Sequence, residues 1–410
     1  VADDFVRRTA ITRLSVDQEQ RNALETTITE WKRGCQIATN LAWGKCNSKS
    51  DVQPLAYDDV REQTDLGSQH SILATHQAAQ CITGCIERKA KGKKATKPQF
   101  TAPTVKYDSR TMTVFDDETV SLSTTDKRVR VGLVLPEDED GYQRQYLDSD
   151  EWNVTESTLT ARDGGFYLHL GFRRYRNGEE RNTAEDGTVL GVDLGVENIA
   201  VTSTARFFSG RKLTHDINHF EDVRGGLQRT GTRSAHRTLG QLSGRQERYS
   251  RDVLHQVANG ILEEAIDYNC DVIAFEDLTD IRERIPYAQW QHRWAFRQLY
   301  SYVEYKAEEH GLLVRQVSPR GTSRRCSQVG CGFTVDENRP TRDHFRCQKS
   351  ECEHEANADY NAARNIGLRY IRRGHQSSRR TGDGQLALKS GTLTPKSGFT
   401  AYSDTSTLAV

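Results

Sequence analysis

The chain contains 410 residues, which at roughly 150 residues per domain allows two or three domains. Its 57 basic residues balance its 57 acidic residues, so net charge alone gives no reason to expect a nucleic-acid partner, although 42 of the basic residues are arginines. The sequence has no run of about 18 apolar residues and no signal peptide, which excludes a membrane partner and predicts a cytoplasmic protein. Nine cysteines are too few for a disulfide framework, so clustered cysteines are candidate metal ligands.

The first part of the chain has helical periodicity from Leu14 to about Lys97. Leu24, Ile28, Trp31 and Cys35 are spaced so that they share one helix face. The region ends in a lysine-rich loop, in which Lys91, Lys93 and Lys94 are candidate phosphate contacts. A solvated surface loop is an equally good interpretation of these lysines.

The pattern of apolar and polar residues then changes twice along the chain. Residues 104–175 alternate apolar and polar side chains in short segments, which predicts an antiparallel sheet or barrel. From Thr188 the pattern is α/β, with strands predicted at 188–192, 199–202, 272–275 and 312–317 and helices between them. Residues 376–410 are rich in Ser, Thr and Gly and have no periodicity, so we expect a disordered tail there.

Three acidic residues stand at the edges of predicted elements. Asp193 ends the strand in Gly191-Val192-Asp193-Leu194-Gly195, Glu276 ends the next apolar strand, and Asp359 begins a helix. A carboxylate that closes an apolar strand is costly to bury unless it is paired or metal-bound. If the three converge, they can hold two Mg²⁺ ions about 3.5–4 Å apart and cleave a phosphodiester. Each acid alone fits a helix cap or a surface group, and the Asp-x-Gly motif also occurs in actin-like sugar kinases.

Four cysteines form the strongest single signal in the sequence. Cys326 and Cys331 make one C-x4-C pair, and after fifteen intervening residues Cys347 and Cys352 make a second pair. Two such pairs predict a tetrahedral zinc site in a hairpin too small to fold without it. His344 and His354 are near enough in sequence to replace a cysteine as ligand. We interpret the other five cysteines as packing groups.

Basic residues recur along a predicted helix between Arg224 and Arg251. Those at helical spacing are Arg229, Arg233, Arg237, Arg245 and Arg248. Such a stripe can follow a phosphate backbone, although a solvated helix face produces the same pattern.

Together these motifs resemble the TnpB/OrfB family of insertion-sequence proteins, relatives of the type V CRISPR nucleases. The resemblance rests on the strand ending in Asp193, on Phe275-Glu276-Asp277-Leu278, on the cysteine hairpin, and on Asn357-Ala358-Asp359-Tyr360-Asn361-Ala362-Ala363-Arg364-Asn365-Ile366. The resemblance covers about 190 residues, from Thr188 to Arg372. The N-terminal half of the chain resembles the family in its layout only.

The resemblance implies a multidomain α+β and α/β fold: a wedge-like β-barrel with a helical insertion, then an RNase H-like RuvC domain with an inserted zinc ribbon. The implied boundaries are the first barrel strand (1–13), helical recognition insertion with its basic loop (14–103), remaining barrel (104–187), first RuvC motifs (188–321), zinc ribbon (322–355), last RuvC motif (356–375) and tail (376–410). Asp193, Glu276 and Asp359 become the Mg²⁺-binding catalytic triad, and the four cysteines the ligands of a structural Zn²⁺.

The implied function is a transposon-encoded endonuclease that a guide RNA directs to double-stranded DNA, working with a separate transposase of the same element. A regulator that binds nucleic acid without cutting, or a strand-transfer transposase, are the alternatives. Two features depart from the family pattern: both cysteine pairs are C-x4-C where many members have C-x2-C, and the net charge is zero. Salt adaptation is our hypothesis for the neutral charge, and nucleic-acid binding that collapsed in molar salt would contradict it.

Overall fold

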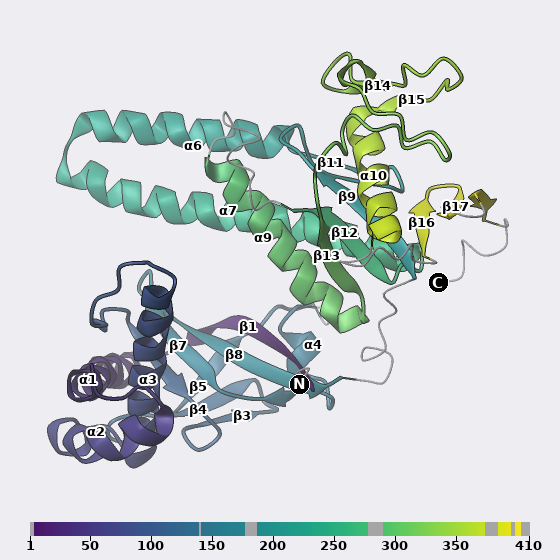
Figure 1. The fold of residues 1–410 in the computed structure, drawn as a ribbon. Coiled ribbons are helices and arrows are strands. Elements are labelled where there is room, and N and C mark those ends of the chain that lie inside the picture. Colours follow the sequence, from purple (N-terminus) through teal and green to yellow (C-terminus); the bar gives the residue numbers. More distant parts are fainter. Residues whose placement is uncertain are drawn as a thin grey trace. The chain divides into compact units, whose positions relative to one another are not determined.

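We describe a computed structural model covering residues 4–138, 141–176, 187–277, 290–373, 384–394 and 398–402. The chain divides into two compact units, Val1–Arg176 and Asn177–Val410, each described here by itself (Figure 1). In the described part of the chain, no helix is long and apolar enough to cross a membrane.

The first unit combines one antiparallel sheet with three helices. Its strands are β1 (Phe5–Ser15), β2 (Thr104–Tyr107), β3 (Met112–Phe115), β4 (Thr119–Ser123), β5 (Arg128–Val134), β6 (Asn153–Val154), β7 (Ser157–Arg162) and β8 (Gly165–Tyr175). They are hydrogen-bonded in the order β2-β7-β8-β1-β5-β4-β3, and β6 pairs with β8. The helices are α1 (Gln18–Ala42), α2 (Lys49–Gln63) and α3 (Ser68–Ala90), with a short α4 (Arg144–Leu147) near the sheet.

The transition from β1 to α1 follows from the local sequence. Alternate residues of β1, from Val6 to Leu14, are buried on one face of the sheet. Asp17 then caps α1 in a capping box with Gln20. The expectation that helical structure begins at Leu14 is therefore wrong by a few residues, because period-two burial continues through Leu14. Further on, a side chain at Gly34 would lie 2.9 Å from Leu66 Cδ1, so α1 packs closely at this glycine and a larger residue would require Leu66 to move.

The second unit has a mixed sheet built around a central strand. Its strands are β9 (Thr188–Leu194), β10 (Asn198–Thr202), β11 (Phe207–Ser209), β12 (Val272–Glu276), β13 (Leu313–Val317), β16 (Gln385–Leu388), β17 (Gly391–Thr394) and β18 (Gly398–Ala401). β9 pairs antiparallel with β10 and parallel with β12 and β16. The strands predicted at 188–192, 199–202, 272–275 and 312–317 are therefore present, as β9, β10, β12 and β13.

Helices cover both faces of this sheet. Leu190, Val192 and Phe275 pack toward α7 (Arg233–Asp267) and α9 (Trp290–Ala307). Val189 and Ala274 point the other way and pack with Ile366 of α10 (Ala358–Arg373). Burial on both faces explains why β9 and β12 are continuous apolar runs rather than alternating ones.

Two expectations for this unit need correction. The basic stretch from Arg224 to Arg251 is not one helix, because α6 (Arg211–Thr230) ends at Gly231, whose φ is +63°, and Thr232 caps the antiparallel α7. The two helices form a hairpin that extends beyond the sheet (Figure 1). The predicted disordered tail is also wrong for its described part, because Leu386 is fully buried in β16 beside β9. Residues 376–383, 395–397 and 403–410 of that predicted tail lie outside the described residues.

Candidate active site and zinc site

The parallel pairing of β9 and β12 brings two of the predicted acids to the same edge of the sheet. Ala274 pairs with Gly191 and Phe275 with Val192, so Glu276 continues this register beside Asp193. Both residues lie where apolar strands end, at the carboxyl edge where open α/β sheets place their ligand sites.

α10 supplies the third acid. Asp359 lies in its first turn, where Asn357 Oδ1 accepts hydrogen bonds from the N–H groups of Asp359 and Tyr360. The helix can reach this position because Gly191 has no side chain. A Cβ at residue 191 would lie only 2.1 Å from Ala363 O. The glycine before Asp193 therefore admits the α10 backbone, which carries Asp359 toward the other acids.

The three carboxylates line one cavity of about 620 Å³. The cavity wall also includes Asn198, Arg320, Arg339 and Arg342. The three acids are spread more widely than a single-ion ligand set: in the described residues, only the four cysteines bring three or more metal-ligating groups within 4.8 Å of one another.

Burial and the neighbouring acids change the pKa of Asp193. Burial, followed by the negative charges of Glu276 and Asp359, raises the pKa of Asp193 well above its usual value, and Arg339 opposes the shift. The metal-free cavity therefore favours a protonated Asp193, and a bound cation would favour the charged form.

Two residues that the sequence analysis missed hold Asp359 in place. Asn198 Nδ2 donates to Asp359 Oδ2 at 3.1 Å, and Arg339 Nη2 lies 3.4 Å from Oδ1 of the same carboxylate. Asn198 begins β10, so the hairpin from β9 returns it to the cavity. Its sequence signal is weak, because a single amide five residues after an acid occurs by chance in many loops.

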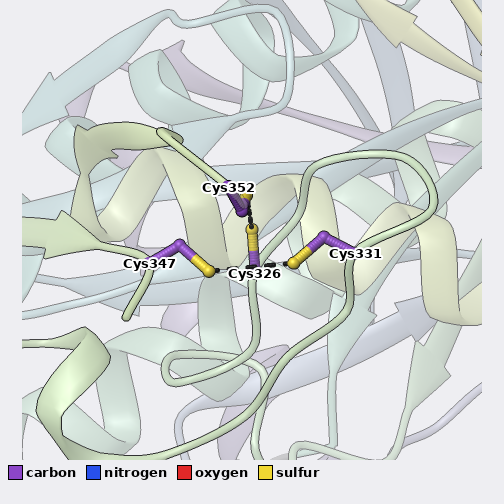
Figure 2. Close-up of side chains that lie close together, drawn as sticks. All are labelled: Cys326, Cys331, Cys347 and Cys352. Atoms are coloured by element: carbon purple, nitrogen blue, oxygen red, sulfur yellow. Dashed lines mark hydrogen bonds between the residues drawn. The ribbon is translucent and has the colours of Figure 1, made fainter. Parts of the chain in front are cut away.

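The four predicted cysteines converge in the ribbon between β13 and α10. Their side chains point to a common centre (Figure 2). The Sγ atoms of Cys326 and Cys352 are 3.8 Å apart, and those of Cys331 and Cys347 are 3.7 Å apart. A tetrahedron with Zn–S bonds of about 2.3 Å has edges of about 3.8 Å, so these two separations match those of a four-cysteine zinc site.

The pKa values of the metal-free thiols shift in different directions. Burial raises the pKa of Cys326 and of Cys347 above the usual thiol value. For Cys331 burial acts in the same direction, but hydrogen bonds from the Phe333 N–H and the neighbouring thiols lower the pKa overall. Metal binding would displace the protons of the raised thiols. The two histidines do not join the cluster: His354 contacts the Ser327 hydroxyl and His344 contacts Glu355.

Hydrogen bonds connect the cysteine ribbon to α10 and so to the cavity. The Ser327 N–H donates to Asn361 Oδ1, and the Asn361 amide donates to the Arg325 carbonyl. Asn365 Nδ2 donates to the carbonyls of Thr322 and Arg325. The motif that follows Asp359 therefore fastens the ribbon to the helix that carries the acid.

The predicted nucleic-acid contacts are exposed side chains in both units. Lys91, Lys93 and Lys94 are exposed after α3, in the first unit. Arg229 lies near the end of α6, and Arg233, Arg237, Arg245 and Arg248 lie on α7, all exposed. Both sets are therefore exposed, and the arginines of the α6–α7 hairpin are not among the residues that line the cavity.

Comparison with known protein families adds to this geometry. Residues 172–282 match the OrfB/IS605 family model, described as a probable transposase, and residues 296–366 match the Cas12f1-like TNB domain. The first segment contains Asp193 and Glu276, and the second contains the four cysteines and Asp359. The resemblance to the TnpB/OrfB family is confirmed.

Several known proteins resemble the chain. It is 30% identical over 239 residues to the CRISPR-associated endodeoxyribonuclease Cas12f1 of Sulfoacidibacillus thermotolerans, covering 54% of each chain. It is 38% identical over 94 residues to a TnpB-like protein of Methanocaldococcus jannaschii, covering 22% of this chain and 34% of that one. The chain spans about half the length of the Cas12f1 relatives that it matches.

A solved structure shares the fold. The cryo-EM structure of a Cas12f1–sgRNA–target DNA complex aligns with a TM-score of 0.59 at 15% identity, covering 86% of this chain and 83% of that one. The overall architecture of sheet, helices and ribbon is therefore similar to that of Cas12f1.

Proposed function

We propose that the chain is an RNA-guided DNA endonuclease of the TnpB type. The observation that carries the proposal is the convergence of Asp193, Glu276 and Asp359 on one cavity, from three elements that lie in two separately matched family segments. The endodeoxyribonuclease activity named for Cas12f1 relatives supports a DNA substrate.

The chemistry proposed for the cavity is hydrolysis of a phosphodiester. Mg²⁺ held by the three acids would supply activation of the attacking water and stabilisation of the leaving oxygen. Asp193, Glu276 and Asp359 would hold the ions, and Asn198 would keep the Asp359 carboxylate oriented. Arginines also line the cavity among its acids and would contact phosphate oxygens, although Arg339 is paired with Asp359 and Arg342 with Glu197.

The remaining parts take roles that the family resemblance suggests. The first-unit sheet is proposed as the wedge barrel and α1–α3 as its helical insertion, both contacting guide RNA. A separate transposase of the same element is proposed as a partner in transposition. Guide pairing would read the target sequence, while the protein reads backbone shape and a short flanking motif. The cysteine ribbon would hold Zn²⁺ as a structural element.

A direct experiment tests the proposal. The protein is expressed with its downstream genomic sequence, the copurifying RNA is sequenced, and that RNA is retargeted to a plasmid library with randomised flanking bases in Mg²⁺. We expect one discrete RNA and cleavage beside a fixed motif. Target binding without cleavage would support the regulator instead, and the absence of any copurifying RNA would contradict the guided mechanism.

We expect the α6–α7 hairpin to contribute salt-dependent affinity for nucleic acid. Arg229, Arg233 and Arg237 are exposed, and their guanidinium groups have no ion pair or hydrogen bond with any described residue. Replacing all three with alanine should reduce the slope of log affinity against log salt by up to about 3, at about 0.9 for each phosphate that is no longer neutralised. A filter-binding titration between about 50 and about 500 mM salt measures this slope.

The matched control for that experiment is Arg251→Ala in the same hairpin. Arg251 is also exposed, but its guanidinium is paired with Glu247 at 2.6 Å. The control should leave the slope unchanged. Equal slopes for the wild type and the triple variant would show that the hairpin surface is only solvated.

A further inference from the structure

Arg364 places a half-buried positive charge in the middle of α10, five residues after Asp359. Its Nε atom is buried and has no hydrogen-bond partner, and no described residue forms an ion pair with its guanidinium. A buried charge without a counter-charge is costly, and so is a buried N–H group without an acceptor. Structural hydrogen bonding therefore does not explain why an arginine stands here.

Hydrogen bonds from α10 determine which part of the ribbon faces this arginine. The Asn361 amide accepts from the Ser327 N–H and donates to the Arg325 carbonyl, so it holds the backbone on both sides of Cys326. Asn365, one turn further along the helix, also donates to the Arg325 carbonyl. Cys326, which is 1% exposed, therefore lies against the turn of α10 that contains Asn361.

The Arg364 side chain extends toward the same turn. Long side chains of a helix point back toward its N-terminus, over the residues three and four positions earlier. Arg364 follows this rule, because its Cζ lies 5.7 Å from the centre of the Tyr360 ring. Asn361 lies three residues earlier on the same helix face. The guanidinium is therefore beside the turn that holds Cys326.

The pKa values agree with this placement. Burial lowers the pKa of Arg364, and the Tyr360 hydroxyl and the Cys326 thiol oppose that shift. The pKa of His354, which belongs to the ribbon, is lowered by burial and then by the positive charge of Arg364. Of these neighbours, Cys326 is the group that becomes an anion when a metal binds, because Zn²⁺ is held by thiolates.

A four-cysteine zinc centre has a net charge that would complement this arginine. Four thiolates around one Zn²⁺ carry two net negative charges. The backbone N–H groups of Gln328, Phe333 and Lys349 donate to three of the thiols, but these donors are dipoles and supply no net charge. The side chains of Arg346 and Lys349, beside the ligands in sequence, are exposed, so water screens their charge.

We infer that Arg364 is the counter-cation of the zinc centre, and that its guanidinium neutralises part of the thiolate charge across the turn that holds Cys326. Arg364 is thus a positioning residue that acts through the metal ligands. The inference rests on the zinc assignment within the proposed function and does not depend on nuclease activity. It gives α10 an electrostatic link to the metal, in addition to the amide bonds of Asn361 and Asn365.

The test compares two variants of the full chain by Zn²⁺ competition with a chromogenic chelator. Arg364→Met removes the charge but keeps a long side chain, and it should weaken Zn²⁺ binding by roughly 10- to 100-fold, as loss of a ligand's partner typically does. Arg364→Lys keeps the charge and should stay close to the wild-type affinity. If the side chain only fills space, the two variants should lose the same affinity.

Cobalt substitution adds a readout of the thiolates themselves. In the Co²⁺-loaded protein, the sulfur-to-metal charge-transfer absorption reports the electron density at sulfur. Loss of the nearby positive charge raises this density, so the absorption should move to longer wavelength in Arg364→Met and stay in place in Arg364→Lys. Equal tetrahedral d–d absorption in all variants shows that the site is intact. The control, Arg346→Met, removes an exposed arginine directly before Cys347 and should change neither affinity nor spectrum.

Two outcomes overturn the inference alone: unchanged affinity and spectrum in Arg364→Met, or equal losses in Arg364→Met and Arg364→Lys. A wild-type protein that binds neither Zn²⁺ nor Co²⁺ would reject the zinc assignment and the inference together. Guided DNA cleavage is measured on the same preparations. Charge-dependent zinc binding without any cleavage would retain the inference and reject the nuclease, whereas cleavage with unchanged zinc binding in Arg364→Met would do the reverse.

Discussion

Replacing Asp193 with asparagine is expected to abolish DNA cleavage and to stabilise the metal-free protein. The loss of activity should be about 10³-fold or more, because metal ions supply several kcal/mol of transition-state stabilisation and about 1.4 kcal/mol corresponds to tenfold in rate. The gain in stability has a separate cause. Burial and the charges of Glu276 and Asp359 hold the pKa of Asp193 well above its usual value, so an ionised Asp193 is unfavourable in the folded state.

The sign of the pH dependence follows from that raised pKa. Above pH ~4 the unfolded chain ionises this carboxyl while the folded protein keeps the proton, so its contribution to stability falls as pH rises toward the folded pKa. Asparagine cannot ionise, so the Asp193→Asn variant does not lose this stability as pH rises. At neutral pH without Mg²⁺ we expect the variant to melt about 2–6 °C higher, from a gain of about 1–2 kcal/mol.

Differential scanning fluorimetry across pH, with and without Mg²⁺, measures both effects. Added Mg²⁺ should stabilise the wild type more than Asp193→Asn, because the ion compensates the negative charge. The control is Asp252→Asn, which removes one exposed carboxylate of α7 without changing the cavity. A variant that melts lower than the wild type at neutral pH, or that still cuts, would reject the assigned role of Asp193.

Much of the second unit is predictable from sequence because its strands are buried on both faces. Runs such as Val272–Phe275 have no other stable place than the interior of a sheet, and an acid at the end of such a run is conspicuous. The positions that were missed depend on pairing across the fold. β16 is a short run that becomes ordered only beside β9, and Asn198 becomes informative only when the β9–β10 hairpin brings it to Asp359.

Glycines show the same division between local and non-local information. The break at Gly231 and Thr232 is a local C-cap and N-cap signal that helical spacing of the arginines concealed. Gly191 stands in the motif that contains Asp193, but the group it admits is the α10 backbone, which no local pattern specifies. Sequence therefore predicts elements and candidate acids, whereas tertiary contact decides which residues orient them.

Replacing Cys347 with serine is expected to release Zn²⁺, unfold the ribbon and reduce cleavage as severely as loss of an acid. Cys347 is 6% exposed, and the ribbon's own buried cluster consists mainly of Phe345, Ala358 and two of the ligands. So small a core cannot replace a structural Zn²⁺ contribution of about 10–16 kcal/mol, the apparent value in zinc-finger peptides. Metal content per chain and limited proteolysis of residues 322–355 measure the first two effects.

Cysteine replacement alone does not distinguish a general loss of fold from a specific effect, so Cys85→Ser is the matched control. Its thiol donates to the Thr96 carbonyl in the first unit, a contact that serine can keep, and the variant should retain both zinc and activity. Zinc binding to the wild type should weaken as pH falls, because the thiols whose pKa is raised must lose their protons to bind the metal. A Cys347→Ser protein with full zinc content would contradict the ligand set.

The decisive measurement for this variant is its Mg²⁺ dependence. Asn361 and Asn365 fasten the ribbon to α10, and Arg339 of the ribbon contacts Asp359 directly. If the ribbon positions the acid, partial loss of zinc should raise the Mg²⁺ concentration needed for half-maximal cleavage before the second unit loses its cooperative unfolding transition. If the ribbon serves only to bind nucleic acid, target affinity should fall while the Mg²⁺ requirement stays constant. That separation would show whether the cysteines act on the catalytic cavity through α10.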